Sequence, residues 1–248
     1  MRTPGMHTLP TTAMNITPEG AVQLAALHMM WLASPALPVG GFSYSEGLEA
    51  AVEAGVVSGE AQALAWLGTQ LRLSQARSEL PAACAAHAAW TLRDVAALSA
   101  IQQWIVATRE TAELALQSRQ MGRSMLEWVR GVHPDHPALS VADALGQPPA
   151  WPLAFALGAH VLGLDAAQTA QALAFSWLEN QVQAAMRVVP LGQSAGQRLL
   201  AGLMPAIPAA VAEALAIAGD RASWQSYSPM LAILSSRHET QYSRLFRS

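Results

Sequence analysis

Apolar residues recur at intervals of three and four along most of the 248-residue chain. Val95, Leu98, Ile101 and Ile105 give the clearest example, because this spacing places all four side chains on one side of a helix. No segment alternates between apolar and polar residues over the length that a half-buried strand needs. The pattern therefore predicts an all-α fold, a single-domain bundle of about ten helices in up-and-down and orthogonal packing.

Helix boundaries are predicted where capping residues, glycines and prolines interrupt this spacing. The predicted helices cover residues 19–33, the segment from Ser43 to Gly55, residues 58–77 and 81–93, the segment after Asp94, and residues 109–130, 150–163, 165–188 and 194–218. A short irregular region is expected at residues 133–149, between two proline-rich turns. Residues 1–18 are predicted to be a disordered lead-in, residues 19–225 a helical domain, and residues 226–248 a mobile C-terminal docking tail.

The most unusual stretch is residues 34–49, where two prolines and two adjacent glycines precede a helix. The prolines hold the backbone extended, and the glycines allow a turn. Ser43 and Glu46 have capping-box spacing, so Ser43 is predicted to cap the helix while Glu46 bonds back to it. Glu46, Glu49 and Glu53 then share one polar face. We interpret the loop as a rigid segment that presents aromatic side chains and this acidic face to a partner. For the glutamates, an ordinary solvated face is the alternative interpretation.

Composition narrows the class of protein. The net charge is −3 and the 14 basic residues, all arginines, form no basic run, which argues against a nucleic-acid binder. The single cysteine, Cys84, lies in an apolar helical run, so we interpret it as an inert core thiol in a reducing compartment. The N-terminus lacks the pattern of a signal peptide. Residues 199–218 are nearly all apolar but include two prolines and a glutamate, which favours a packed helix over a membrane span.

No set of residues typical of a catalytic or metal site stands out. The sequence has no phosphate-binding loop, no nucleophile elbow and no paired cysteines. His133 and His136 have metal-ligand spacing, but without a third ligand nearby a solvated turn is the favoured interpretation. His28, His87 and His160 each lie alone in an apolar helix and are interpreted as core histidines with satisfied hydrogen bonds. The chain is therefore predicted not to be an enzyme.

Several polar residues occupy positions where a helix should be apolar. Asn180 and Arg187 share a heptad-spaced stripe with Trp177, and burial of an unpaired charge is strongly unfavourable. They must therefore be paired inside the chain, or this face meets another chain. The amide-rich turn at residues 189–197 is either a simple bend or part of such a surface. Gly122 lies inside a helix at a cost of about 1 kcal/mol relative to alanine, which indicates close approach of another helix.

The last segment carries side chains that are typical of docking surfaces. Its stripe residues at helical spacing are Leu231, Leu234, His238, Tyr242 and Leu245. Arginines and aromatic residues at the end of the chain are the types enriched at interface hot spots. A last helix packed on its own domain is the alternative, and we favour a docking role.

These pieces together resemble the family of the urease accessory protein UreF. The resemblance rests on stretches that occur in the family's order, namely Leu32 to Glu49 (LASPALPVGGFSYSEGLE), Arg109 to Gly122, Val189 to Gln197 and His238 to Ser248. It spans residues 27–248. One departure is visible at Glu46, where family members often carry an uncharged residue.

The resemblance implies an all-helical, cytoplasmic homodimer with no chemistry of its own. Proteins like this act as chaperones in nickel insertion: they bind the accessory protein UreD (UreH in some organisms) and recruit the GTPase UreG to the urease apoprotein. No cofactor is implied, because the assembly handles the nickel. The tail would order on meeting UreD, with Arg244 as the main contact, and the loop would help to receive UreG. The residues expected to bind partners are Phe42, Ser43, Tyr44, Glu46, Glu49, Arg119, Gln120, Arg187, Gln193, Gln197, Arg237, His238, Glu239, Tyr242, Arg244, Leu245 and Phe246.

Two alternatives stay open at this point. A stand-alone helical enzyme would use Glu46, Glu179 and His160 in the bundle core, and a cavity that holds a titratable pair would favour it. As a second possibility, the chain modulates the GTPase by supplying Arg119 or Arg187 to its active site.

Overall fold

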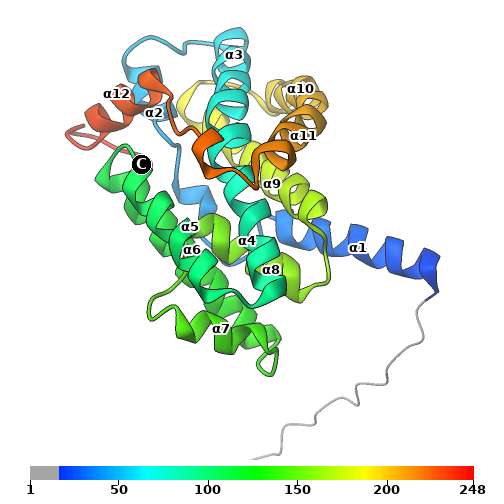
Figure 1. Cartoon of the computed structure of the whole chain (residues 1–248). Coiled ribbons are helices and arrows are strands. Elements are labelled where there is room, and N and C mark those ends of the chain that lie inside the picture. The colour runs from blue at the N-terminus through cyan, green and yellow to red at the C-terminus, as the bar shows by residue number, and fades with distance from the viewer. Residues whose placement is uncertain (1–16) are drawn as a thin grey trace, which may run out of the picture.

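The computed structural model describes residues 17–248, and all regular structure within that range is helical (Figure 1). The predicted lead-in falls outside the described residues except for its last two positions, and α1 begins at Pro18. The elements, with η for 3₁₀ or π segments, are α1 (Pro18–Ala33), η1 (Gly41–Ser43), α2 (Leu48–Glu53), α3 (Glu60–Gln70), η2 (Leu71–Glu79), α4 (Leu80–Leu92), α5 (Val95–Thr108), α6 (Ala112–Val132), α7 (Ala138–Ala144), α8 (Trp151–Val161), α9 (Ala166–Val188), α10 (Gln193–Leu203), η3 (Met204–Ala206), α11 (Ile207–Ile217), η4 (Arg221–Ser223) and α12 (Pro229–His238). Because η2 joins α3 to α4 and η3 joins α10 to α11, these elements amount to ten separate helices in the described part of the chain. The predicted all-α fold is confirmed.

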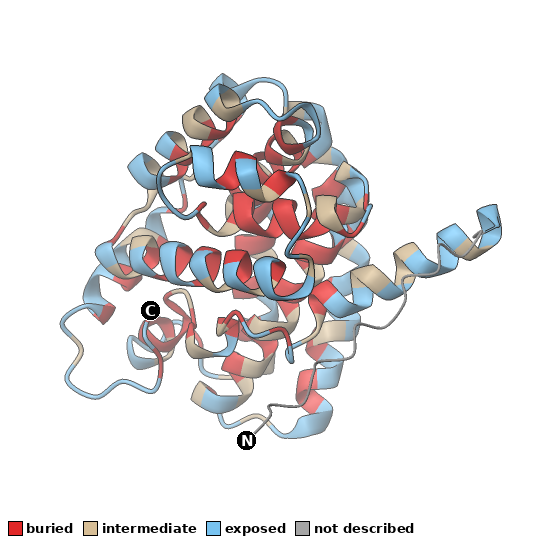
Figure 2. Ribbon diagram, turned by 90° about the horizontal axis from the view of Figure 1, so that it is seen from below, coloured by how far each residue is buried: buried red, intermediate tan, exposed pale blue. Residues whose placement is uncertain are grey.

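Two helices form the centre of the bundle. α9 packs against α1, α2, α4, α10 and α11, and α8 packs against α4 and α6. All residues of α8 from Pro152 to Ala159 are buried, as expected for a helix that is apolar on every side. Buried residues gather on the inward faces of the helices, whereas the N-terminal part of α1 extends away from the body (Figure 2).

Two predictions about helix boundaries are wrong. The region predicted to be irregular contains α7, whose first backbone N–H, that of Ala138, donates to the ring of His136. The break predicted at residues 78–81 is absent, because η2 is a π-helix in which the N–H of Leu80 bonds to the carbonyl of Gln75. The wider turn carries the chain into α4 without interruption.

The long apolar stretch near the C-terminal end is packed on the bundle. Gln193–Ile217 is the one stretch of residues 17–248 that is long and apolar enough to cross a membrane by length and composition. It consists of α10 and α11 joined by η3, and both helices pack against α9. Leu199, Leu203 and Ile207 are buried in the core. This packing supports the interpretation as a packed helical pair.

Three local predictions are confirmed. Gly122 lies where α6 meets the start of α8, and a Cβ atom there would be 2.1 Å from the carbonyl oxygen of Pro149. Asp94 caps α5 by accepting the N–H of Ala97 at 2.9 Å. Cys84 is buried, and burial raises its pKa to about 12, so the thiol is inert at neutral pH.

Candidate functional site

The loop before α2 is shaped by glycines in the left-handed region. Gly40 and Gly47 have φ angles of 75° and 77°, a conformation that glycine adopts without a Cβ clash. Between them, residues 41–43 form η1, and α2 begins only after Gly47, without a side-chain cap. The predicted capping box of Ser43 and Glu46 is therefore wrong, because the helix begins after both residues.

Glu46 points into the protein. Its φ is 49°, and its carboxylate accepts hydrogen bonds from the amide of Gln117 at 2.7 Å and from the indole N–H of Trp177 at 2.8 Å. Burial raises the pKa of Glu46, while the indole hydrogen bond acts in the opposite direction. Glu49 is also buried, and of the three predicted glutamates only Glu53 is exposed. An exposed acidic face was thus wrongly expected at Glu46 and Glu49, because both carboxylates have partners inside the fold.

A small polar cavity adjoins Glu46. Its walls also include Glu79, Arg109 and Glu110. Burial acts to lower the pKa of Arg109, but its ion pair with Glu79 outweighs this effect and raises the pKa. Burial raises the pKa of Glu110. The cavity measures about 40 Å³, which is room for about one water molecule and not for an organic substrate.

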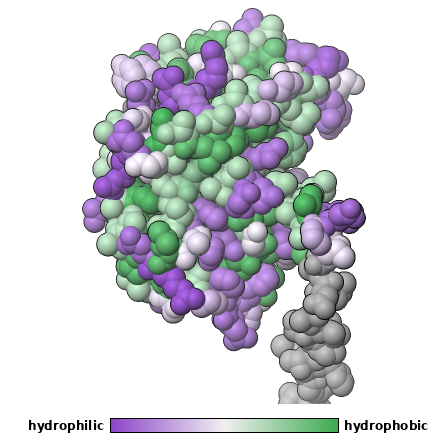
Figure 3. Space-filling model, turned by 45° about the vertical axis from the view of Figure 1, so that its right-hand side comes forward, coloured by the Kyte–Doolittle hydropathy of each residue, from purple (hydrophilic) through white to green (hydrophobic). Residues whose placement is uncertain are grey.

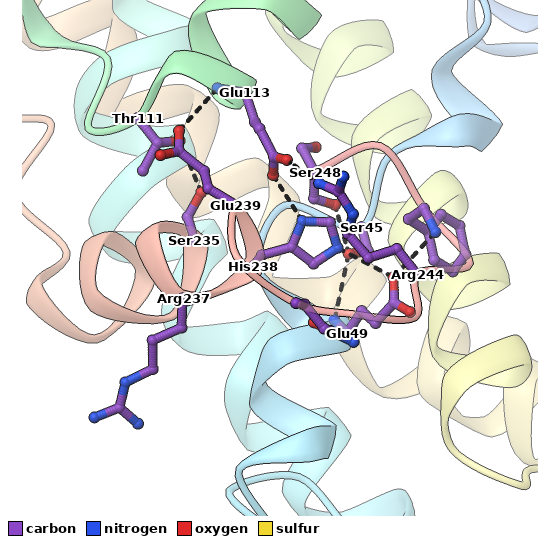
Figure 4. A network of polar contacts seen from close by, with 12 residues as sticks. Ser45, Glu49, Thr111, Glu113, Ser235, Arg237, His238, Glu239, Arg244 and Ser248 are labelled. Carbon is purple, nitrogen blue, oxygen red and sulfur yellow. Dashed lines mark hydrogen bonds and ion pairs between the residues drawn. The ribbon is translucent and has the colours of Figure 1, made fainter.

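Residues 239–248, named the C-terminal strap below, are held by the carboxylate of Glu49 (Figure 4). Its two oxygens accept the backbone N–H groups of Leu245 at 2.7 Å and of Phe246 at 3.0 Å. The same carboxylate lies 3.2 Å from Nε2 of His238. Hydrogen bonds to an ionised acceptor are shorter and stronger than those between neutral groups. One buried side chain on α2 therefore binds a segment that lies 196 positions later in the sequence.

His238, the last residue of α12, is fully buried between two carboxylates. Its Nδ1 lies 2.6 Å from Glu113 on α6, and its Nε2 faces Glu49 on α2. Glu113 also pairs with Arg244 of the strap at 2.5 Å, so the residue expected to be the main partner contact is engaged within the chain. The network joins α2, α6, α12 and the strap.

The two ends of the strap are fixed separately. At its start, Glu239 accepts the backbone N–H groups of Ala112 at 2.9 Å and Glu113 at 3.4 Å, which are unsatisfied donors at the beginning of α6. Nearby, Arg237 points away from the network and is exposed (Figure 4).

At the other end of the strap, backbone hydrogen bonds fix it to the loop. Arg247 donates its N–H to the carbonyl of Ser43 at 2.9 Å, and the carbonyl of Ser248 accepts the N–H of Ser45 at 2.8 Å. The loop and the tail, which the sequence singled out separately, are therefore one surface.

The outer side of the strap is exposed. Tyr242 is fully exposed and Leu245 is 73% exposed, whereas Phe246 is buried with the guanidinium of Arg187 5.9 Å from its ring centre. The helical stripe predicted through Tyr242 and Leu245 is wrong, because α12 ends at His238 and the chain then turns back across the loop. The mobility predicted for this segment stays a prediction.

The remaining residues expected to bind partners lie in two places. The exposed ones are Phe42, Arg119, Gln120, Gln193 and Gln197. Tyr44 is buried and donates its hydroxyl to Oε1 of Gln120 at 2.6 Å, which joins the loop to α6. The two glutamines of α10 lie elsewhere, on a helix that packs against α3 and α9.

Three residues of the α9 stripe contact the loop. Trp177 bonds to Glu46, and the amide of Asn180 lies against Gly41, where a Cβ atom would be 2.7 Å from Nδ2. Arg187 donates to the carbonyl of Phe42 at 3.5 Å. The stripe therefore contacts the loop, while Arg187 itself stays exposed, and contact of this face with another chain stays a prediction.

Histidines from separate elements meet at another place on the surface. The ring of His160 contacts those of His87 and His136 edge to face, with ring centres 5.8 and 5.7 Å apart. His28 and His87 also bond to backbone carbonyls just after α8, at 2.8 and 2.7 Å, so the satisfied hydrogen bonds expected for them are confirmed. The expectation that His28, His87 and His160 lie in the core is wrong, because all three are half-buried. Among residues 17–248, no three His, Cys, Asp or Glu side chains are arranged to hold a metal ion.

Sequence reasoning missed the interior residues that bind the strap. Glu113 and Gln117 bond to Arg244 and to the hydroxyl of Ser248, and Ser45 donates its hydroxyl to the carbonyl of Ser248 at 2.6 Å. No local signal marks these residues, because two polar residues four apart on a helix are also typical of a solvated face.

Comparison with known proteins identifies close relatives over nearly the whole chain. A model of the UreF family matches residues 57–204. The chain is 54% identical over 233 residues to a urease accessory protein UreF of Paracidovorax citrulli, which covers 93% of this chain and 92% of that protein. It is 53% identical over 243 residues to UreF of Methylibium petroleiphilum, which covers 97% and 100%. A bifunctional urease accessory protein UreEF of Bordetella bronchiseptica is 46% identical over 99% of this chain and 56% of that protein.

Proposed function

Because the chain belongs to the UreF family of urease accessory proteins, we propose that it is a scaffold that bridges the accessory protein UreD (UreH) and the GTPase UreG during nickel insertion into apo-urease. The observation that carries this proposal is the single surface made by the loop and the C-terminal strap. Its inner side is fixed by the buried carboxylate of Glu49 and the half-buried carboxylate of Glu113, and its outer side exposes Tyr242 and Leu245. Exposed aromatic and apolar side chains on a rigid support lose little conformational entropy on binding.

The strap is the part that we propose to dock on UreD. A variant that lacks the residues after Ser228 should fail to co-purify with UreD and should not support urease activation. A milder pair of changes, Tyr242→Ala with Leu245→Ala, should weaken capture while leaving the folded body intact, because both side chains are exposed. Val106→Ala, an exposed apolar change on α5, is the matched control. If the truncated variant still assembles with UreD and supports activation, the strap is not the docking element.

The loop side of the same surface is proposed to receive UreG. Arg119 is exposed on α6, and Arg187 is exposed at the end of α9 beside Phe42 of the loop, so both guanidinium groups are able to act on a partner. We propose that the chain modulates GTP hydrolysis through one of them. The test is the rate of GTP hydrolysis by UreG with each single Arg→Ala variant; a rate that is unchanged by both variants refutes this part. Nickel is cargo of the assembly in this proposal and not a cofactor of the chain.

We also propose a homodimer in which α1 takes part. Val22, Leu27 and Met30 are 71%, 60% and 68% exposed along this helix, and a groove of about 660 Å³ lined by α1, α9 and α11 adjoins it. Hydrophobic side chains also cover much of the neighbouring body (Figure 3). Leu27→Asp should convert a dimeric native mass to a monomeric one, whereas Gln23→Asp on the same helix should not. A dimer that withstands Leu27→Asp excludes α1 from the interface.

Catalysis by this chain is not part of the proposal. The polar cavity does hold titratable groups, the feature that would favour an enzyme, but its volume of about 40 Å³ excludes a substrate. The three candidates for an enzyme do not line one cavity: Glu46 lines the polar cavity, Glu179 lines the groove beside α1, and His160 lies among the histidines. We propose the cytoplasm as the location, since the cysteine is a buried thiol in keeping with a reducing compartment.

A further inference from the structure

A shallow groove of about 510 Å³ lies where the loop, α6 and the C-terminal strap meet. The polar side chains in its wall, other than one glutamate, are Ser43, Tyr44, Gln120, Arg123, Ser124 and Arg247. Each of these six carries a hydrogen-bond donor. The glutamate is Glu127, which pairs with Nε of Arg123 at 3.1 Å and so leaves the two terminal nitrogens of that guanidinium available.

The amide of Gln120 is oriented by its neighbour. Its Oε1 accepts the hydroxyl of Tyr44 at 2.6 Å, so Nε2 is the atom left to donate into the groove. Burial raises the pKa of Tyr44, although Arg247 acts against this, so the hydroxyl keeps its proton and the amide keeps this orientation. The groove therefore offers an amide donor together with two guanidinium groups.

The charge of the surface around the groove depends on which charged side chains face the solvent and which face the interior. The chain as a whole carries a net charge of −3. The carboxylates of Glu46, Glu49 and Glu113 are turned inward: α6 and α9 satisfy Glu46, and the strap and α12 satisfy the other two. Arg123 and Arg247 are exposed in the groove. These two guanidinium groups face one exposed carboxylate in the groove wall, that of Glu127, so the groove carries a positive excess that attracts acidic ligands.

We propose that this groove binds an acidic segment of a partner protein, and that the strap must be docked for the groove to exist. The inference rests on the proposed docking function and names the chemistry of the partner. Arg247 reaches the groove because its backbone N–H bonds to the carbonyl of Ser43, while Glu49 accepts the N–H groups of the two preceding strap residues. A guanidinium pairs with a carboxylate through two parallel hydrogen bonds, so two arginines that line one groove suit two acidic side chains on an extended segment.

The test uses the full-length protein and a fluorescein-labelled peptide of ten glutamates, with fluorescence anisotropy at low salt. Arg123→Gln and Arg247→Gln should each weaken peptide binding about tenfold. Glu49→Ala should weaken it as strongly as Arg247→Gln, because release of the strap takes Arg247 out of the groove. Arg72→Gln, which removes an exposed arginine outside the groove, is the matched control. Equal affinity of all variants overturns the proposal. Inorganic phosphate that displaces the peptide at equal concentration also overturns it, since the groove would then be a site for small anions.

A second arm separates this inference from the proposed function. Capture of UreD and UreG is measured with the double variant Arg123→Gln, Arg247→Gln. Loss of capture of one partner, with capture kept by Arg72→Gln, supports the groove as its docking contact. Capture of both partners at the wild-type level overturns the groove as a docking contact while the scaffold function stands. Failure of the wild-type protein to capture either partner overturns the scaffold function, and the peptide arm still decides the chemistry of the groove.

Discussion

The side chain whose removal tests the site most directly is Glu49. Glu49→Ala deletes the acceptor of two backbone N–H groups of the strap, at 2.7 and 3.0 Å, and one of the two carboxylates beside His238. A hydrogen bond to a charged group contributes about 1.5–3 kcal/mol, and in the released strap water replaces the lost acceptor, so the lower figure applies to each N–H. The docked state should therefore lose about 3 kcal/mol, which is roughly a hundredfold in the equilibrium between docked and released strap.

Hydrogen–deuterium exchange of the C-terminal peptide is the assay. In the Glu49→Ala protein, amides of residues 245–247 should exchange roughly a hundredfold faster, while peptides from the buried helix α8 keep their protection. Glu53→Ala is the matched control, because this glutamate lies four residues further on in α2 and is exposed. Glu49→Gln retains one acceptor oxygen and should give an intermediate rate. Exchange in the Glu49→Ala protein that equals the rate in the Glu53→Ala protein would refute the assigned role of this carboxylate.

Three further predictions concern stability and the loop. Gly122→Ala should lower the free energy of unfolding by about 2–3 kcal/mol, because the new methyl group meets backbone at the start of α8. Gly131→Ala in the same helix meets open space and should raise the free energy of unfolding by about 0.5–1 kcal/mol. Denaturant unfolding measures both changes. Burial and neighbouring histidines lower the pKa values of His133 and His160 below 6.5, so the unfolded chain binds more protons and the free energy of unfolding should fall as pH drops below 6.5. His160→Gln should make the free energy of unfolding depend less steeply on pH between about 7.5 and 5.5, and an unchanged dependence counts against the effect. Gly41→Val should displace the amide of Asn180, disturb the loop and reduce partner capture in a pull-down, and wild-type capture would show that the turn tolerates a side chain.

The helices were predictable because their signals are local. Asp94 caps α5 through a hydrogen bond to a residue three positions away, and the stripe from Leu98 to Ile105 faces the core as its spacing requires. The π-helix before Pro81 was not predictable, since a wider turn has no residue pattern that distinguishes it from a break before proline. Periodicity therefore gave the fold class and most boundaries, and it failed where the backbone changes its hydrogen-bond spacing.

The candidate site was predictable in its location and not in its geometry. The loop and the tail stood out by their residue types, but the spacing of Ser43 and Glu46 suggested a local cap. In the fold, the backbone carbonyl of Ser43 bonds to the strap and the carboxylate of Glu46 bonds to α6 and α9, so long-range partners satisfy a carboxylate that could have bonded locally. A glutamate such as Glu49 has the same sequence signature whether it faces water or accepts hydrogen bonds from the backbone of a distant segment. Only the packing of α2 against α12 decides between these two states.

The docked strap also constrains how a partner can use it. A partner that binds the outer side, at Tyr242 and Leu245, stabilises the docked state and should bind more weakly to the Glu49→Ala protein, in which that state is depleted. A partner that takes up the released strap must first displace it from Glu49 and from its other contacts, and the share of Glu49 in this cost is about 3 kcal/mol. For that second kind of partner, Glu49→Ala removes this share of the cost and should strengthen binding. The sign of the change in UreD affinity caused by one substitution therefore distinguishes recognition of a preformed surface from capture of a released segment.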